Sequence, residues 1–286
     1  MKIVKRPDIM QRIAGRLKRR GKSIGFVPTM GALHEGHLSL IRRARRANDI
    51  LVVSIFVNPL QFGPSEDLKR YPRPFEKDKK LCRKEGVDFI FYPGAESLYP
   101  RDFKTRIAVN DLEDVLCGKS RPGHFRGVAT VVAKLFNIVQ PDTAYFGQKD
   151  AQQAVIIRRM ARDLNMPLNI AVMPVVREKD GLAMSSRNVY LDADERRDAA
   201  VLPQALKLAE GLVKKNVRDS AKIVSKMKEL IQQRKTASVD YISVVDPDGL
   251  LPVRRINPCS RALIALAVRI GRTRLIDNIM VGNKGR

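Results

Sequence analysis

The feature that most constrains the fold is an alternation of short apolar runs with amphipathic stretches between residues 24 and 176. The apolar runs predict strands at residues 24–27, 50–57, 88–92, 142–146 and 168–176. The stretches between them predict helices at residues 38–47, 75–85, 126–139 and 152–165. Repeated strand–helix–strand units with apolar strands are typical of a parallel sheet that is covered on both faces. We therefore predict an α/β fold of this kind.

The pattern changes after residue 181. Residues 192–212 and 219–233 predict two charged helices, and residues 239–245, 262–268 and 275–279 predict strands. A length of 286 residues is comfortable for two domains. We predict a Rossmann-like, nucleotide-binding parallel sheet with helices on both faces in residues 1–180, and a smaller C-terminal α+β lid domain in residues 181–286.

The chain is strongly basic, with 54 Lys and Arg against 30 Asp and Glu and a net charge of +24. Such a field attracts nucleic acids, nucleotides and acidic metabolites. Proteins that read nucleic acid usually add stacking aromatic residues or a recognisable module. Here aromatic residues make up 6%, Trp is absent and no such module is found. Nucleic-acid binding is therefore the less favoured alternative, and we expect no specific nucleic-acid partner.

Cysteine usage and hydropathy bear on the cellular compartment. The chain has three cysteines, Cys82, Cys117 and Cys259, which is an odd number. They lie far apart and form no C-x-x-C pair, so neither a disulfide framework nor a zinc site is predicted. No apolar run approaches the roughly 20 residues that a membrane span needs, and residues 1–11 lack the apolar core of a signal peptide. We expect a cytoplasmic protein with no membrane partner.

The segment after the first predicted strand, residues 28–37, reads PTMGALHEGH. A strand, a tight turn with glycine and a helix N-terminus together form an anion site. Gly31 and Gly36 lack Cβ atoms and let a phosphate or ribose approach the backbone. His34 and His37 are three residues apart, hence on one helix face, where they can donate to phosphate oxygens. Two alternatives are a metal pair, although zincins space their histidines four apart, and incidental surface histidines.

These residues carry a resemblance. His34-x-Gly36-His37 resembles the H-x-G-H signature of the nucleotidyltransferase superfamily, which includes class I aminoacyl-tRNA synthetases. Residues 28–37 as a whole resemble the pantothenate synthetase family. Further matches to that family are NPLQF at 58–62, HFRG at 124–127, FGQKD at 146–150, MSSRN at 184–188 and residues 273–279. The resemblance covers nearly all of residues 24–190, and five ordered motifs make it specific.

The resemblance implies an acid–amine ligase of coenzyme A precursor biosynthesis. Its reaction is the ATP-dependent condensation of (R)-pantoate with β-alanine to pantothenate, through a pantoyl adenylate and with release of AMP and pyrophosphate. The expected partners are ATP, pantoate and β-alanine, with Mg²⁺ as cofactor, and the expected assembly is a homodimer. No protein nucleophile is needed, so positioning and electrostatic stabilisation are expected to carry catalysis.

The resemblance also implies the site residues. Catalytic roles fall to His34, His37, Lys149 and Arg187. The residues expected to bind ATP are Met30, Gly31, His34, Gly36, His37, Gly147, Gln148, Lys149, Asp150, Val176, Met184, Ser185, Ser186 and Arg187. Those expected to bind pantoate or β-alanine are Asn58, Gln61, Tyr71, Arg126 and Gln153, and Asp78 is a possible metal contact.

The residue chemistry supports these assignments independently. Amides such as Asn58 and Gln61 offer both donors and acceptors to a substrate that carries hydroxyls and a carboxylate. Lys149 follows a predicted strand, where a point charge can meet phosphates. The rival within the superfamily is an H-x-G-H nucleotidyltransferase that stops at a phosphoanhydride, which would need a phosphorylated acceptor. The sequence leaves open whether His124 or Lys179 takes part.

Overall fold

The structure, a computed structural model, describes residues 1–64 and 66–282, which form two compact units. The first contains residues 1–114, 121–147 and 156–174, and the second residues 115–120, 148–155 and 175–286. The units are interleaved along the chain, whereas the domains expected from the sequence divide it once, after residue 180; that division stays a prediction. Within the described residues, no helix combines the length and the apolar character that crossing a membrane requires.

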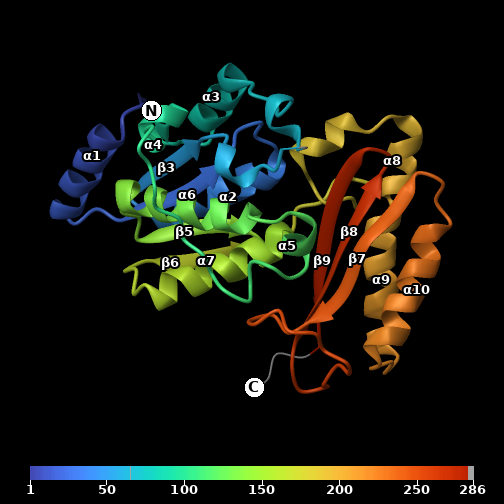
Figure 1. The fold of residues 1–286 in the computed structure, drawn as a ribbon. Helices are drawn as coiled ribbons and strands as arrows, with labels where there is room; N and C mark the ends of the chain where they lie inside the picture. Colours follow the sequence, from blue (N-terminus) through green and yellow to red (C-terminus); the bar gives the residue numbers. More distant parts are fainter. Residues whose placement is uncertain (65, 283–286) are drawn as a thin grey trace. The chain divides into compact units, whose positions relative to one another are not determined.

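The first unit is built on a six-stranded parallel sheet (Figure 1). Its strands lie in the order β1 (Lys2–Val4), β4 (Phe89–Phe91), β3 (Ile50–Ile55), β2 (Ile24–Thr29), β5 (Thr143–Gly147) and β6 (Asn169–Met173). From β2 the chain moves outward through β3 and β4, then returns to the other side of β2 for β5 and β6. The boundary between β2 and β5 is therefore a topological switch point, where open α/β sheets bind their ligands.

Helices cover both faces of this sheet. They are α1 (Pro7–Arg19), α2 (Glu35–Ala47), α3 (Phe75–Lys84), the short α4 (Ala95–Leu98) and α6 (His124–Val139), with 3₁₀ turns η1 (Pro59–Gln61) and η2 (Asp67–Lys69). Phe26 of β2 packs edge-on against Phe136 of α6. The next residue, Val27, joins a cluster on the opposite face with Ile41 of α2 and Cys82 of α3. Since successive strand residues point to opposite faces, both must be apolar, which explains the uninterrupted apolar runs. The predicted fold class is confirmed.

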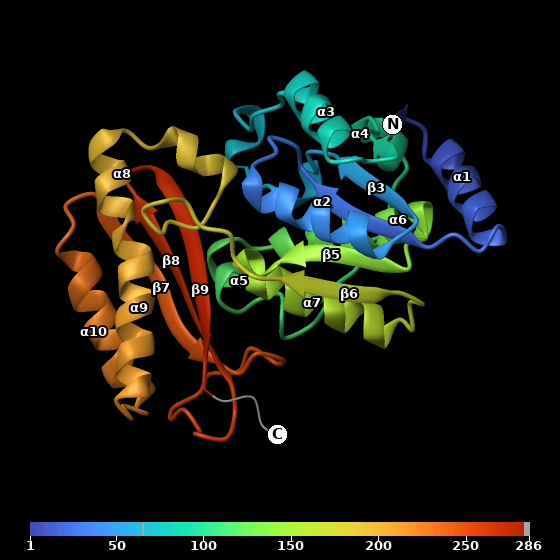
Figure 2. The same cartoon turned by 180° about the vertical axis from the view of Figure 1, so that it is seen from behind.

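The second unit contains a three-stranded antiparallel sheet with β7 (Ala237–Val245), β8 (Ala262–Ile270) and the edge strand β9 (Thr273–Val281) in that order (Figure 2). Its helices are α5 (Cys117–Ser120), α8 (Ala193–Ala199), α9 (Val201–Lys214) and α10 (Ser220–Gln232), and its 3₁₀ turns are η3 (Gln148–Asp150) and η4 (Ser186–Tyr190). Helix α7 (Ala151–Asp163) begins in this unit and ends in the first. Helices α9 and α10 bury one face of the sheet around Leu206, Met227 and Leu266.

One predicted helix is wrong in its extent. Residues 192–212 form two helices, α8 and α9, with the break at Ala200. Pro203 explains the break, because it has no N–H to donate to the carbonyl of Ala199 and is tolerated only in the first turn of a helix. Strand β1 and helix α5 were not predicted, because segments this short carry too little periodicity.

Candidate active site

The turn that follows β2 has a shape that requires glycine. Thr29 Oγ1 donates to the carbonyl of Ser54 at 2.8 Å and accepts from the Gly31 amide at 3.1 Å. Gly31 has φ +85°, and a Cβ there would lie 3.0 Å from Asp78 Oδ2. A side chain would therefore meet both backbone strain and a crowded neighbour.

Asp78 of α3 holds the next residues of this turn. Its Oδ2 accepts from the Ala32 amide and its Oδ1 from the Leu33 amide, both at 2.8 Å. The carboxyl is buried, and this burial raises the pKa of Asp78, with the two amide bonds acting in the opposite direction. These contacts show a positioning role for Asp78. Its predicted contact with a metal stays a prediction.

His34 and His37 lie at the beginning of α2. His37 Nδ1 accepts from the His34 amide at 3.4 Å, and the two ring centroids are 4.1 Å apart. In a neutral His37 this bond leaves the proton on Nε2, which is a donor. Both rings are half-buried and sit at the N-terminus of a helix of 13 residues, where the helix dipole favours an anion. The geometry can bind phosphate oxygens.

The turn after β3 brings three further predicted residues together. Asn58 is buried; its Nδ2 donates to Gln61 Oε1 and to the Gly127 carbonyl, both at 3.1 Å, and its Oδ1 accepts from Tyr99 at 2.9 Å. Gln61 Nε2 in turn lies 3.2 Å from the sulfur of Met30. Asn58 therefore fixes the side-chain amide of Gln61 beside Met30, a residue of the turn that follows β2.

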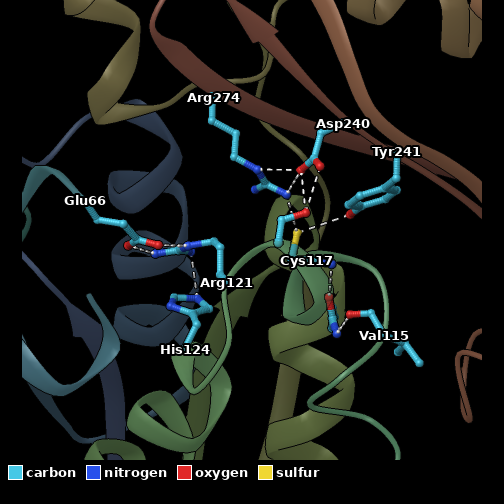
Figure 3. A network of polar contacts seen from close by, with 10 residues as sticks. Glu66, Val115, Cys117, Arg121, His124, Asp240, Tyr241 and Arg274 are labelled. Atoms are coloured by element: carbon cyan, nitrogen blue, oxygen red, sulfur yellow. Dashed lines mark hydrogen bonds and ion pairs between the residues drawn. The ribbon is translucent and has the colours of Figure 1, made fainter. Parts of the chain in front are cut away.

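His124 supports the same turn from α6. Its Nδ1 lies 2.7 Å from the Gln61 carbonyl. Its Nε2 lies 2.9 Å from Nη1 of Arg121, which also forms a bidentate ion pair with Glu66 at 2.7 and 2.5 Å (Figure 3). A guanidinium can only donate, so Nε2 accepts and Nδ1 carries the proton given to Gln61. His124 is thus a positioning residue for Gln61, a role that the sequence left open.

Gly127, one turn further along α6, permits a close approach of backbones. A Cβ at this position would lie 2.2 Å from the carbonyl oxygen of Leu60. The last residue of the HFRG motif is therefore required by packing against η1. Together with His124, it explains why this motif and the NPLQF motif occur together in one chain.

Two predicted substrate residues have other partners in the first unit. Arg126 pairs with the buried Glu113 at 2.5 Å. Tyr71 is buried with its ring edge against Phe62, the centroids 5.9 Å apart. Their contacts with substrate stay predictions.

In the second unit, Lys149 lies two residues after Gly147, the last residue of β5. Lys149 is half-buried, and its ammonium lies 3.6 Å from the carboxylate of Asp150. The carbonyls of Gln148 and Lys149 each accept a bond of 2.9 Å from Asn278 of β9. Asn278 was not singled out from the sequence; the only signal was the match of residues 273–279 to the family.

The N-terminus of α7 is fixed by a buried polar network. Gln152 accepts from the Cys117 amide at 3.0 Å and donates to the Val115 carbonyl at 2.7 Å, and the Cys117 thiol lies 3.2 Å from the hydroxyl of Tyr241 (Figure 3). Burial raises the pKa of Tyr241, so its phenol stays neutral. These bonds define the position of the next residue, the half-buried Gln153.

Residues 176–188 form a closed turn that brings the remaining predicted residues together. The Met184 amide donates to the Val176 carbonyl at 3.0 Å, and Arg177 and Ala183 form a β-bridge. Ser185 Oγ accepts from the Arg187 amide at 3.3 Å, which begins η4. The turn thus presents two hydroxyls and a guanidinium within three residues.

Across the described residues, no group of three or more His, Cys, Asp or Glu side chains is arranged to hold a metal ion.

Comparison with known proteins agrees with this geometry. The sequence model of the pantoate–β-alanine ligase family matches residues 2–280. Pantothenate synthetase from Caldicellulosiruptor saccharolyticus is 56% identical over 281 residues, which cover 98% of this chain and 99% of the relative.

Two solved structures extend the likeness to the fold. Pantothenate synthetase from Thermus thermophilus is 45% identical with a TM-score of 0.92, covering 99% of this chain and 100% of that one. Pantoate–β-alanine ligase from Francisella tularensis, complexed with beta-gamma ATP and β-alanine, is 34% identical with a TM-score of 0.81, covering 98% and 97%. The resemblance seen in the motifs is confirmed: the chain belongs to the pantoate–β-alanine ligase family, the pantothenate synthetases.

Proposed function

We propose that this chain condenses (R)-pantoate with β-alanine in two ATP-dependent steps. In the first, a carboxylate oxygen of pantoate attacks the α-phosphorus of ATP and the bond to the bridging oxygen breaks, which gives pantoyl adenylate and pyrophosphate. In the second, the amine of β-alanine attacks the acyl carbon and loses a proton, and AMP leaves with the oxygen that came from pantoate. The observation that carries the proposal is the His34–His37 pair at the N-terminus of α2, directly after β2 at the switch point of the sheet.

The triphosphate is proposed to bind to hydrogen-bond donors that the fold positions in advance. His37 Nε2 and the His34 ring offer N–H donors, and a preorganised donor can stabilise the charge that develops on phosphate oxygens. The family resemblance adds Lys149, Ser185, Ser186 and Arg187 to the triphosphate, and Met30, Gly31, Gly36, Gly147, Gln148, Asp150, Val176 and Met184 to the nucleotide. Mg²⁺, when bound, would neutralise part of the charge on the phosphate oxygens.

Pantoate and β-alanine are assigned to the amide side chains. The side-chain amide of Gln61 is held by Asn58 and Met30, and the backbone carbonyl of Gln61 is held by His124, so the amide is positioned before substrate arrives. Preorganisation of this kind lowers the entropic cost of orienting a carboxylate for attack. The Francisella tularensis relative, complexed with beta-gamma ATP and β-alanine, supports the choice of substrates. By resemblance we also propose a cytoplasmic homodimer.

The partial reaction tests this proposal most simply. If a free-standing adenylate forms, the enzyme with pantoate and Mg²⁺ alone should exchange labelled pyrophosphate into ATP, and AMP should accumulate only after β-alanine is added. A phosphoanhydride-forming nucleotidyltransferase would instead show no response of AMP release to the amine. Exchange that strictly requires β-alanine would contradict the two-step reaction.

A further inference from the structure

Strand β9 carries two adjacent polar residues that are buried and have no assigned role. Asp277 and Asn278 are 2% and 4% exposed. Successive residues of a strand point to opposite faces. Asp277 lies opposite Leu266, on the face that α9 and α10 cover, and Asn278 lies opposite Ala265, on the other face. The pair can therefore bind two different segments from one rigid position.

Asn278 binds the segment that carries Lys149. Its Nδ2 donates to the carbonyls of Gln148 and Lys149 at 2.9 Å, and its Oδ1 accepts from Gln148 Nε2 at 3.1 Å. These two carbonyls belong to the peptide planes on either side of the Lys149 Cα. Holding both planes fixes the direction in which the Lys149 side chain leaves the backbone.

Asp277 binds the turn that precedes Met184. Its carboxylate forms a two-pronged ion pair with Arg177 at 2.6 and 3.1 Å, and its Oδ1 also accepts from the Asn278 amide at 2.8 Å. Arg177 donates further to the Gly181 carbonyl at 3.0 Å, inside the turn closed by Met184 and Val176. A fully buried carboxylate needs such partners, and a paired guanidinium is held in one geometry.

We infer that Asp277 and Asn278 are positioning residues for nucleotide binding: Asn278 sets Lys149, and Asp277 sets the segment from Met184 to Arg187. The inference rests on the proposed assignment of Lys149 and Arg187 to the triphosphate. It explains why one short stretch of an edge strand contacts both segments, about 130 and 100 residues away in sequence. Nothing in the pair needs to touch the substrate.

The test is a double-mutant cycle on pyrophosphate exchange. Asn278→Asp keeps the shape of the side chain but turns an oxygen toward two carbonyls, and Asn278→Ala removes the amide without adding charge. Each should lower the exchange rate by about 10²-fold, the scale of a misplaced catalytic group. In a Lys149→Ala background the same changes should have less than about a threefold further effect, because the group they position is gone. Asp277→Asn should likewise slow exchange in the parent and should have less than about a threefold further effect in an Arg187→Ala background.

Thr273→Val is the matched control, since Thr273 is also buried on β9 but, within the described part of the chain, forms no hydrogen bond to either segment. It should leave exchange within about threefold of the parent. If the Asn278 and Lys149 effects multiply independently, or if Thr273→Val is as slow as Asn278→Ala, the inference is overturned and the proposed function stands. If Lys149→Ala exchanges at the parental rate, the triphosphate assignment fails and the inference fails with it.

Discussion

Replacing His37 by alanine should lower the rate of adenylate formation by about 10²–10³-fold, the effect of losing one preorganised donor in a transition state. The reason is geometric: His37 Nδ1 accepts from the His34 amide, so in the neutral ring Nε2 carries the proton and is the donor. Pyrophosphate exchange with pantoate alone measures this step without the amine.

Two conservative variants separate the donor from the fold. His37→Asn places an acceptor near the position of Nδ1 and keeps the bond to the His34 amide, but it lacks the distal donor and should be nearly as slow as alanine. His37→Gln reaches farther and should recover part of the rate. Exchange at the parental rate in His37→Ala would show that this ring does not act on the phosphates.

Replacing Asp78 by alanine should have the largest effect on stability that we expect from a single change at the site. The substitution leaves the Ala32 and Leu33 amides without their acceptor. Each buried amide that loses its acceptor should lower the free energy of unfolding by about 1–3 kcal/mol. The turn that carries His34 should also lose its position, so exchange should fall together with the free energy of unfolding. Denaturant unfolding measures the first quantity.

The control for Asp78 is a neighbour on the same helix. Glu76 is exposed and pairs with Lys79 only at the surface, so Glu76→Ala should cost at most about 1 kcal/mol. Asp78→Asn tests the charge itself. Because burial raises the pKa of Asp78, the folded chain holds the carboxyl proton of Asp78 more tightly than the unfolded chain does. The contribution of Asp78 to stability therefore falls as the pH rises above the ordinary pKa of an aspartate. That pH dependence should be absent in Asp78→Asn; equal stability of Asp78→Ala and Glu76→Ala would contradict the role of Asp78.

Much of the fold could be predicted because its strands are buried on both faces. Neighbours such as Phe26 and Val27 face different helices, so the sequence carries an apolar run that periodicity detects. Strand β1 contains three residues, too few to show any period. The break between α8 and α9 depends on a single proline. The spacing of apolar residues continues through this proline, so a pattern of apolar residues does not detect the break.

The candidate site was predicted where its residues lie in the turns that follow strands, as His34, Asn58 and Lys149 do. The contacts that hold them were missed because the pairing is tertiary: Asp78 was predicted only as a possible metal contact, and Asn278 was not singled out. Asp78 lies 46 residues from Ala32, and Asn278 lies 129 residues from Lys149. Neither distance leaves a local pattern. The charge count likewise could not show that Arg42 pairs with Glu85, or Arg45 with Asp88.

The central claim is that pantoate is activated as an adenylate, and the fate of its carboxylate oxygen tests that claim most directly. Pantoate labelled with ¹⁸O in the carboxylate is converted with ATP and β-alanine, and the nucleotide product is analysed by mass spectrometry. Attack at the α-phosphorus places one labelled oxygen in the phosphate of AMP. Label in inorganic phosphate, with ADP as the nucleotide product, would show attack at the γ-phosphorus and contradict the account.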